Sequence, residues 1–298
     1  MHDNLGAQIT ADIHRLESLP AIVLQALDQL SQPDVNLRQV SEVIGQDSVI
    51  TARMMSIANS VYYRRGAAVH RLSDALVRLG ISMVKEVLLT ASVIGIMDRK
   101  LNGYQLDRGQ IFRHSLATAI GARLIAQRIN YPYREEAYIA GLLHDIGKLI
   151  FDRYLNERYN DVIVYATTNE VSFVDAEAHI LGYDHAQIGG LVIAAWDLPA
   201  RFVEAVATHH NPSMARDFPE LAYIVHLANA FTLSLGLDVG GDGLMAMVDA
   251  DAVTKLNLDL DQIDMLIADI AEAVVAAGLG VETAAVDGLY GDAAVGAV

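Results

Sequence analysis

The sequence predicts an all-α fold, on three observations. Apolar residues recur at helical spacing along nearly the whole chain, for example at Val23, Leu27 and Leu30 and again from Val84 onward. Stretches in which apolar and polar residues alternate, as they do in strands, are few. Residues that start or stop helices lie between the apolar runs. We therefore expect a multi-helix bundle, with an additional helical region at its N-terminal side.

The helix boundaries follow from these start and stop residues. Pro20 lies where a helix is expected to begin, because its fixed backbone angle suits the first turn. Asp184 precedes a helical run, and the Asp47-Ser48 pair can cap the segment after it. The expected helix stops are Gly80, Gly182 and the Asn211-Pro212 pair.

Composition and charge limit the class of protein. Hydrophobic residues form 53% of the 298-residue chain and charged residues 19%, with a mean hydropathy of +0.29, so most of the chain is expected to be packed. The formal net charge is -16 and the pI is near 4.9. Arg64-Arg65 is only a pair and no larger basic cluster is evident, so nucleic acid is not expected as a partner.

Cysteine is absent, which excludes disulfides, thiolate zinc sites and cysteine nucleophiles and leaves His, Asp and Glu as metal ligands. The acidic N-terminus lacks the basic and apolar regions of a signal peptide. The longest apolar stretch of the first half, Val87 to Met97, is too short to span a bilayer. We therefore expect a soluble cytoplasmic protein without membrane contact.

Three regions are expected along the chain. Residues 1–100 form an N-terminal helical subdomain without a histidine cluster, and residues 101–235 form a helical domain that contains most of the histidines. Residues 236–298 form a C-terminal helical extension, with an amphipathic helix near Asp261 to Ala277. Its low-complexity end, Gly291 to Val298, is expected to be poorly ordered.

The His144-Asp145 pair is the main candidate for chemistry. It lies in an apolar helical run, where adjacent ionisable groups are costly unless a partner such as a bound cation satisfies them. The two side chains diverge by about 100° on a helix, so His144 can hold one ion while Asp145 bridges to another. The alternative is a purely structural, hydrogen-bonded buried pair.

Other histidines extend this candidate site. His209-His210 repeats the paired geometry, and His114 and His185 lie on separate helical segments, the arrangement by which bundles assemble metal sites. Imidazole and carboxylate ligands suit iron, manganese, zinc or nickel. In a catalytic version, two ions about 3.5–4 Å apart would generate hydroxide, with Lys148 balancing developing charge.

These residues belong to a longer ordered series of motifs, and with it the chain resembles the HDOD family, relatives of the HD phosphohydrolases and the HD-GYP cyclic-di-nucleotide phosphodiesterases. The resemblance covers most of residues 15–235 and implies an HD-domain-like bundle. Its motifs are Leu19-Pro20-Ala21, Asp47 to Ala52, Ala58-Asn59-Ser60, Leu79-Gly80, Arg113-His114-Ser115, Gly141 to Gly147, His185, Trp196 to Pro199, His209-His210 and His226 to Asn229.

The resemblance also implies a ligand set, which is His114, His144, Asp145, His185, His209 and His210, closed in the metal-binding relatives by a later acid. Here the candidate for that last position is Asn229, a neutral amide. A further acid expected one turn before His114 is Gln110. Both departures remove negative charge and should weaken the binding of two or three ions. The Gly-Tyr-Pro motif that the resemblance associates with cyclic di-GMP is absent after His210.

Several of these residues also have a simpler, purely structural interpretation. His209-His210 can be a solvent-exposed helix C-terminus, Lys148 a surface lysine with only its stem packed, and Trp196 to Pro199 core packing at a helix boundary. His179 and His226 are interpreted as structural. Glu177 is expected to orient a ligand imidazole, and the polar stretch Asn59 to Gly66 can be a simple turn.

Two functions follow. The first is a bacterial signal-transduction protein with a degenerate, non-catalytic metal pocket, whose N-terminal helices present a surface to a signalling protein partner. The second is a metal-dependent phosphohydrolase or phosphodiesterase acting on a nucleotide or other phosphorylated small molecule, with Asp145 and Lys148 as catalytic residues. A third interpretation is an adaptor with an empty pocket.

Overall fold

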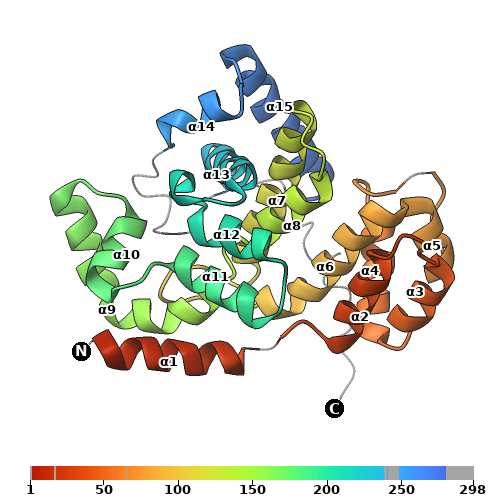
Figure 1. Cartoon of the computed structure of the whole chain (residues 1–298), viewed down its shortest axis with the longest axis horizontal. Coiled ribbons are helices and arrows are strands. Elements are labelled where there is room, and N and C mark those ends of the chain that lie inside the picture. The colour runs from red at the N-terminus through yellow and green to blue at the C-terminus, as the bar shows by residue number, and fades with distance from the viewer. Residues whose placement is uncertain (1, 17, 65, 238–239, 241–247, 280–298) are drawn as a thin grey trace. The chain divides into compact units, whose positions relative to one another are not determined.

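The computed structural model describes residues 2–16, 18–64, 66–237, 240 and 248–279, and this part of the chain consists of helices joined by loops (Figure 1). Its one β-type contact is an isolated bridge between Leu101 and Leu106. The predicted all-α class is confirmed. No helix within the described ranges combines the length and apolar character needed to cross a bilayer. The expected disorder of Gly291 to Val298 lies outside the described residues.

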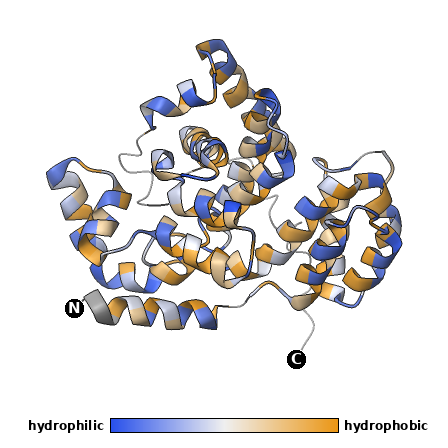
Figure 2. Cartoon of the chain, viewed as in Figure 1, coloured by the Kyte–Doolittle hydropathy of each residue, from blue (hydrophilic) through white to orange (hydrophobic). Residues whose placement is uncertain are grey.

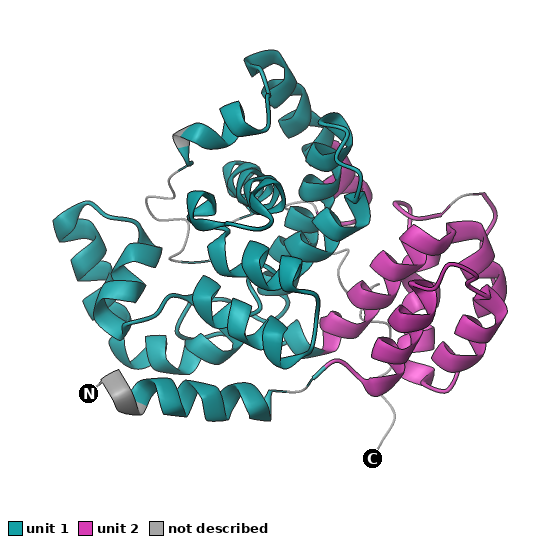
Figure 3. Ribbon diagram, viewed as in Figure 1, with its two compact units in different colours: residues 1–18, 96–271 teal, residues 19–95, 272–298 magenta. Residues whose placement is uncertain are grey.

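The chain divides into two compact units (Figure 3). Unit 1 comprises residues 1–18 and 96–271, and unit 2 comprises residues 19–95 and 272–298. The division into domains 1–100, 101–235 and 236–298 stays a prediction. Along the helices, hydrophobic and hydrophilic positions are interleaved, as expected where one side of a helix is buried (Figure 2).

Unit 2 contains the helices that follow α1 (His2–Arg15) in the N-terminal third of the chain. Asp47 caps one of them, accepting hydrogen bonds from the backbone N–H groups of Val49 and Ile50, both at 2.9 Å. Asn59 closes the following loop, because its side chain both donates to and accepts from the backbone of Val69, so the polar stretch after it is a turn. The helices are α2 (Ala21–Leu30), α3 (Leu37–Ile44), α4 (Ser48–Asn59), α5 (Leu72–Leu79) and α6 (Ile81–Met97), the last of which continues into unit 1.

Unit 1 carries the histidines. Its helices are α1 (His2–Arg15), α7 (Gln110–Arg128), α8 (Arg134–Leu143), α9 (Lys148–Asn169), α10 (Phe173–Leu181), α11 (His185–Ala195), α12 (Ala200–Thr208), α13 (Pro219–Ser234), α14 (Ala250–Lys255) and α15 (Leu260–Ala276), with the short 3-10 helix η1 (Pro212–Met214). The last turns of α15 fall in unit 2. α7 and α13 are buried over most of their surfaces and pack against α8, which places them at the centre of the unit.

Two glycines let the central helices approach one another. Gly141 lies on α8 against the backbone of Ala119 on α7, where a Cβ atom would be 2.9 Å from the Ala119 Cα. Gly147 lies just before α9, and a Cβ there would overlap the carbonyl oxygen of His185 and the backbone nitrogen of Gly189. The second glycine therefore sets how close α11, which begins at His185, lies to the chain that follows His144-Asp145.

Gly147→Ala is expected to lower the free energy of unfolding by roughly 2–4 kcal/mol, because the overlap is with backbone atoms and only a shift of α11 can relieve it. Urea denaturation measures the loss. Gly121→Ala is the matched control, since its Cβ would lie 3.3 Å from the flexible end of Ile270. Equal stability of the two variants would contradict this account of the helix contact.

Candidate metal centre

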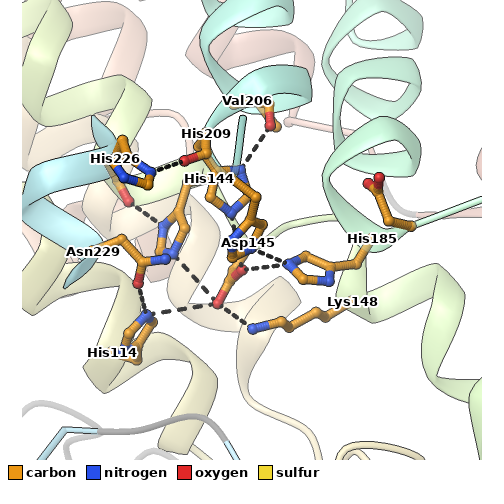
Figure 4. Close-up of polar contacts among 12 residues, drawn as sticks. His114, His144, Asp145, Lys148, His185, Val206, His209, His226 and Asn229 are labelled. Carbon is orange, nitrogen blue, oxygen red and sulfur yellow. Dashed lines mark hydrogen bonds and ion pairs between the residues drawn. The ribbon is translucent and has the colours of Figure 1, made fainter. Parts of the chain in front are cut away.

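The predicted convergence of the histidines is confirmed, because side chains from four separate stretches of unit 1 meet at the site of Asp145 (Figure 4). Two groups of candidate ligand atoms form, each with its atoms within 4.8 Å of one another. One group is His114, His144 and Asp145, and the other is His185, His209 and His210. His144 directly follows α8 and His209 directly follows α12, while His185 begins α11.

Asp145 lies between the two groups and points one carboxylate oxygen at each. Its Oδ2 is 3.4 Å from the Nε2 atom of His144 and 3.8 Å from that of His114. Its Oδ1 is 3.4 Å from the Nε2 atom of His185 and 3.9 Å from that of His209. This is the bridging position that the sequence predicts for Asp145, now with the oxygen that faces each group identified.

Hydrogen bonds at Nδ1 orient three of these imidazoles. His144 donates from Nδ1 to the carbonyl oxygen of Gly141 at 2.7 Å, and His209 donates to that of Val206 at 2.8 Å. Both acceptors lie three residues back, in the last turn of the preceding helix. His185 donates from Nδ1 to Glu177 Oε2 at 2.7 Å. A neutral imidazole that donates from Nδ1 carries a lone pair on Nε2, so three Nε2 lone pairs face the Asp145 carboxylate.

Burial keeps three of the pocket's imidazoles neutral. It lowers the pKa of His209 to about 3 and the pKa values of His144 and His210 well below the ordinary range, and the attraction of Asp145 does not restore them. Burial alone would raise the pKa of Asp145, but the neighbouring His144 and Lys148 hold it well below its usual range. Near neutral pH the pocket therefore presents an ionised carboxylate beside the uncharged imidazoles of His144, His209 and His210.

Several polar atoms at the centre have no hydrogen-bond partner among the described residues. They are His144 Nε2, His209 Nε2 and Asp145 Oδ1, and all three are buried. Each is an acceptor, and a buried acceptor without a partner costs about 1–3 kcal/mol. A cation at the group of His185, His209 and His210 would satisfy His209 Nε2 and Asp145 Oδ1, and one at the group of His114 and His144 would satisfy His144 Nε2. The donor set of imidazole nitrogens and one carboxylate therefore fits a divalent transition metal.

Lys148 occupies the other oxygen of Asp145. Its side chain is fully buried and its Nζ donates to Asp145 Oδ2 at 2.7 Å, so the interpretation as a surface lysine is wrong. The reason is that α9 begins at Lys148, one turn after Asp145, and the i,i+3 spacing brings the two charges together. The ammonium also lies 5.5 Å from the centre of the Tyr104 ring.

Tyr104 is a member of this site that the sequence did not indicate. Its hydroxyl donates to Glu177 Oε1 at 2.7 Å, while the other oxygen of Glu177 holds His185. Glu177 therefore contacts the His185 imidazole, as predicted. Tyr104 lies in the loop before α7 without a motif around it, and only the folded chain brings it to Lys148 and Glu177.

The two positions where the resemblance expects acids differ in location. The side chain of Asn229, on α13, lies beside His114, with its Oδ1 2.9 Å from His114 Nε2, while His114 Nδ1 donates to the carbonyl oxygen of Leu237 at 2.6 Å. Gln110 is exposed at the start of α7 and accepts a hydrogen bond from the backbone of Asp107 at 2.6 Å. Asn229 is therefore part of the centre, and the Gln110 side chain is held elsewhere.

The structure also decides the interpretations of the other residues named in the sequence analysis. The exposed-terminus interpretation is wrong for His209, which is fully buried because α12 packs against α8, α11 and α13. His226 is structural, since Nδ1 donates to the His209 carbonyl at 2.7 Å and Nε2 accepts from the backbone N–H of Asp249 at 2.8 Å. His179 stacks on Tyr165 with ring centres 4.1 Å apart. Trp196 is buried between α11 and α12, as predicted for a helix boundary.

Acid should destabilise the metal-free protein well above the pH at which carboxylates titrate. The folded pKa of His209 is about 3 and its unfolded pKa is near 6.5, so below pH ~6.5 the unfolded chain binds a proton that the folded chain does not. This contribution of His209 is complete above pH ~6.5 and falls by about 2 kcal/mol at pH ~5. His144, His210 and His226 shift in the same direction.

Urea denaturation of chelator-treated protein at a series of pH values measures this loss. A free energy of unfolding that is unchanged between pH ~7.5 and ~5 would contradict the neutral, buried state of the imidazoles. His226→Gln serves as an internal check, because it removes one of these histidines, which contacts the backbone of His209 and not its ring, and it should therefore reduce the pH dependence.

Comparison with known proteins shows which family the sequence resembles. The family model described as HDOD domain matches residues 16–212. An uncharacterized protein of Treponema pallidum (strain Nichols) is 24% identical over 236 residues, which are 76% of this chain. The chain spans only 44% of the length of that relative.

Solved structures extend the likeness to the fold. An HDOD domain protein of unknown function from Geobacter sulfurreducens is 22% identical, with 92% of this chain and 98% of that chain covered and a TM-score of 0.74. A provisionally named phosphohydrolase from Shewanella amazonensis SB2B is also 22% identical, with coverages of 91% and 97% and a TM-score of 0.70. A provisionally named signal transduction protein from Marinobacter aquaeolei VT8 has the same identity and TM-score, with coverages of 89% and 60%. Because the family model matches well over half of its length, the chain belongs to the HDOD family.

Proposed function

We propose that this chain is a non-catalytic regulatory HDOD protein that binds one divalent metal ion, and that Lys148 takes the place of a second ion. The observation that carries the proposal is the 2.7 Å contact between Lys148 Nζ and Asp145 Oδ2. That oxygen faces His114 and His144, so the protein's own ammonium neutralises the side of Asp145 that belongs to their group.

The charge of the pocket supports a single ion. Its buried ionisable groups other than histidine are Asp145 and Glu177, each with a formal charge of -1, and Lys148, with a charge of +1. One divalent ion brings this small, water-excluded pocket to a net charge of about +1, while a second would raise it to about +3. The amide of Asn229 and the displaced Gln110 supply no compensating charge.

The ion is proposed to lie at His185, His209, His210 and Asp145 Oδ1. These are the atoms left without a competing cation, and Oδ1 and His209 Nε2 have no hydrogen-bond partner in the described part of the chain. The Nε2 atoms of His185 and His210 are 2.9 Å apart, a separation that two ligands of one ion can have. Iron, manganese, zinc and nickel all accept such a set, and its imidazole content favours zinc, nickel or iron.

A pocket of this kind lacks what hydrolysis by two metals requires. Two ions clamp the attacking and leaving oxygens of a phosphoryl group, and a single ion beside a lysine does not reproduce that clamp. We propose instead that metal occupancy sets the conformation read by a signalling protein partner, with the domain of residues 1–100 presenting the partner surface. The name of the Marinobacter aquaeolei protein, which refers to signal transduction, agrees with this role.

The second candidate function is a metal-dependent phosphohydrolase or phosphodiesterase acting on a nucleotide or other phosphorylated small molecule. The observation that favours it is the pair of ligand groups bridged by Asp145, the arrangement that two ions need. In that case His114, His144 and Asn229 complete the second ion's ligands, and Lys148 must leave Asp145 to balance charge on the substrate.

Metal analysis separates the two functions. We expect about one equivalent of metal per purified chain, lost in His209→Ala and retained in His114→Ala, with no turnover in a phosphodiesterase screen with added manganese. Two equivalents in the unmodified protein, or turnover that Asp145→Ala abolishes, would establish the enzyme instead. Circular dichroism of both variants verifies that a missing metal is not a missing fold.

A further inference from the structure

His185 differs from His144 and His209 in the group that holds its ring. Those two imidazoles donate from Nδ1 to backbone carbonyl oxygens three residues back, which the helix itself fixes. His185 donates instead to Glu177 Oε2 at 2.7 Å, and its backbone N–H donates to the same oxygen at 3.2 Å. Glu177 is a long side chain on another helix, α10, so the orientation of His185 depends on what fixes that carboxylate.

The Tyr104 hydroxyl holds the other oxygen of that carboxylate. It donates to Glu177 Oε1 at 2.7 Å, and both side chains are fully buried. With Oε1 held by Tyr104 and Oε2 held by His185, the carboxylate cannot rotate without losing a hydrogen bond. Without the hydroxyl, Glu177 would turn toward another donor, because a buried oxygen that lacks a donor is costly, and the His185 ring would lose its fixed partner.

The backbone around Tyr104 is fixed as well. Asp152, one turn after Lys148 on α9, accepts a hydrogen bond at Oδ1 from the backbone N–H of Gly103 at 2.6 Å. Gly103 lies so close to α9 that a Cβ atom there would overlap the carbonyl oxygen of Asp152. At Gly240 a Cβ would overlap the carbonyl oxygen of Tyr104 in the same way. The phenol therefore extends from a loop whose own position is closely set, which a precise hydrogen bond requires.

The Tyr104 ring makes contacts that do not depend on its hydroxyl. It packs edge-on against the His185 ring with centres 6.0 Å apart, and the Lys148 ammonium lies 5.5 Å from its centre. Phenylalanine would keep the ring, and with it both contacts. The variant Tyr104→Phe therefore isolates the hydrogen bond to Glu177.

We propose that Tyr104 is a positioning residue of the metal centre: through Glu177 it holds the His185 imidazole in the tautomer and orientation that present Nε2 to the ion. The inference rests on the proposed function, because it requires an ion at His185, His209 and His210. Tyr104 supplies no ligand atom, so its loss changes the affinity and the geometry of the ligands and leaves the number of ions unchanged.

Cobalt(II) is the probe, because its visible absorption depends on the number and geometry of its ligands. In titrations of the chelator-treated full chain, we expect Tyr104→Phe to bind cobalt at least about tenfold more weakly than the unmodified protein, with shifted absorption bands and the same stoichiometry. Tyr159→Phe is the matched control, because Tyr159 packs on the Phe173 ring as Tyr104 does, with ring centres 6.3 Å and 6.2 Å from it.

The outcomes separate this inference from the proposed function. Cobalt binding in Tyr104→Phe that is as tight as in Tyr159→Phe, with the same spectrum, would overturn the inference and leave the proposed function standing. No cobalt bound by the unmodified protein would overturn both. Urea denaturation of each variant measures stability separately, because a purely structural tyrosine would lower stability without changing the spectrum of the bound ion.

Asp152→Ala tests the same series of contacts without altering Tyr104. It removes the acceptor of the Gly103 N–H and should weaken cobalt binding by about threefold, in the same direction as Tyr104→Phe. In the double variant the affinity should equal that of Tyr104→Phe alone, because no hydroxyl is left for the loop to position. Unchanged affinity in Asp152→Ala, or losses that add in the double variant, would overturn the inference.

Discussion

Asp145→Asn is expected to abolish metal binding and to lower the free energy of unfolding of the metal-free protein by about 3–5 kcal/mol. Asp145 contributes an oxygen to each ligand group and forms an ion pair with the buried Lys148. Removing one partner of a buried ion pair leaves an uncompensated charge, which accounts for the loss of stability. Loss of a charged ligand should reduce metal affinity by more than about a hundredfold.

The measurements are metal content by elemental analysis and urea denaturation with and without chelator. Asp269→Asn is the matched control, because it removes an exposed carboxylate that pairs with Arg128 at 3.2 Å and should change stability by less than about 1 kcal/mol. A variant that keeps its metal, or that is as stable as the control, would show that Asp145 is not the centre of the site.

Lys148→Met is expected to raise the metal stoichiometry from about one to about two ions per chain. Methionine fills a similar volume without the charge, so Asp145 Oδ2 becomes available to an ion held with His114 and His144. Without metal the variant should be less stable by about 3 kcal/mol, since an ionised carboxylate is left among lone pairs. Added metal should restore that stability by mass action.

Equilibrium dialysis against manganese or zinc measures the stoichiometry, and thermal unfolding measures the rescue. Lys100→Met is the control, because Lys100 is an exposed residue of unit 1 whose partner, Asp107, lies outside the site. A stoichiometry that stays at one in Lys148→Met would mean that the lysine does not exclude the second ion, and the charge argument for a single ion would fail.

Much of the fold could be predicted from local sequence. Asp47 and Asp184 cap the helices that follow them, and Gly182 ends α10 in the left-handed conformation expected of glycine, with a φ of 81°. These signals act within one turn of the chain, so all the interacting residues are neighbours in the sequence and can be identified from it. The contacts of Lys148 and Tyr104 involve other helices, and their burial could not be predicted in this way.

The sequence by itself determined the all-α class and the set of histidines that surround Asp145, because helical periodicity, helix caps and an ordered series of motifs are written along the chain. Only the tertiary structure decided that Lys148 neutralises one oxygen of Asp145 and that the Gln110 side chain is held by the backbone of Asp107. Charge balance in a buried pocket depends on distances between helices remote in sequence. Those distances are set by packing, and they cannot be predicted from a local sequence pattern.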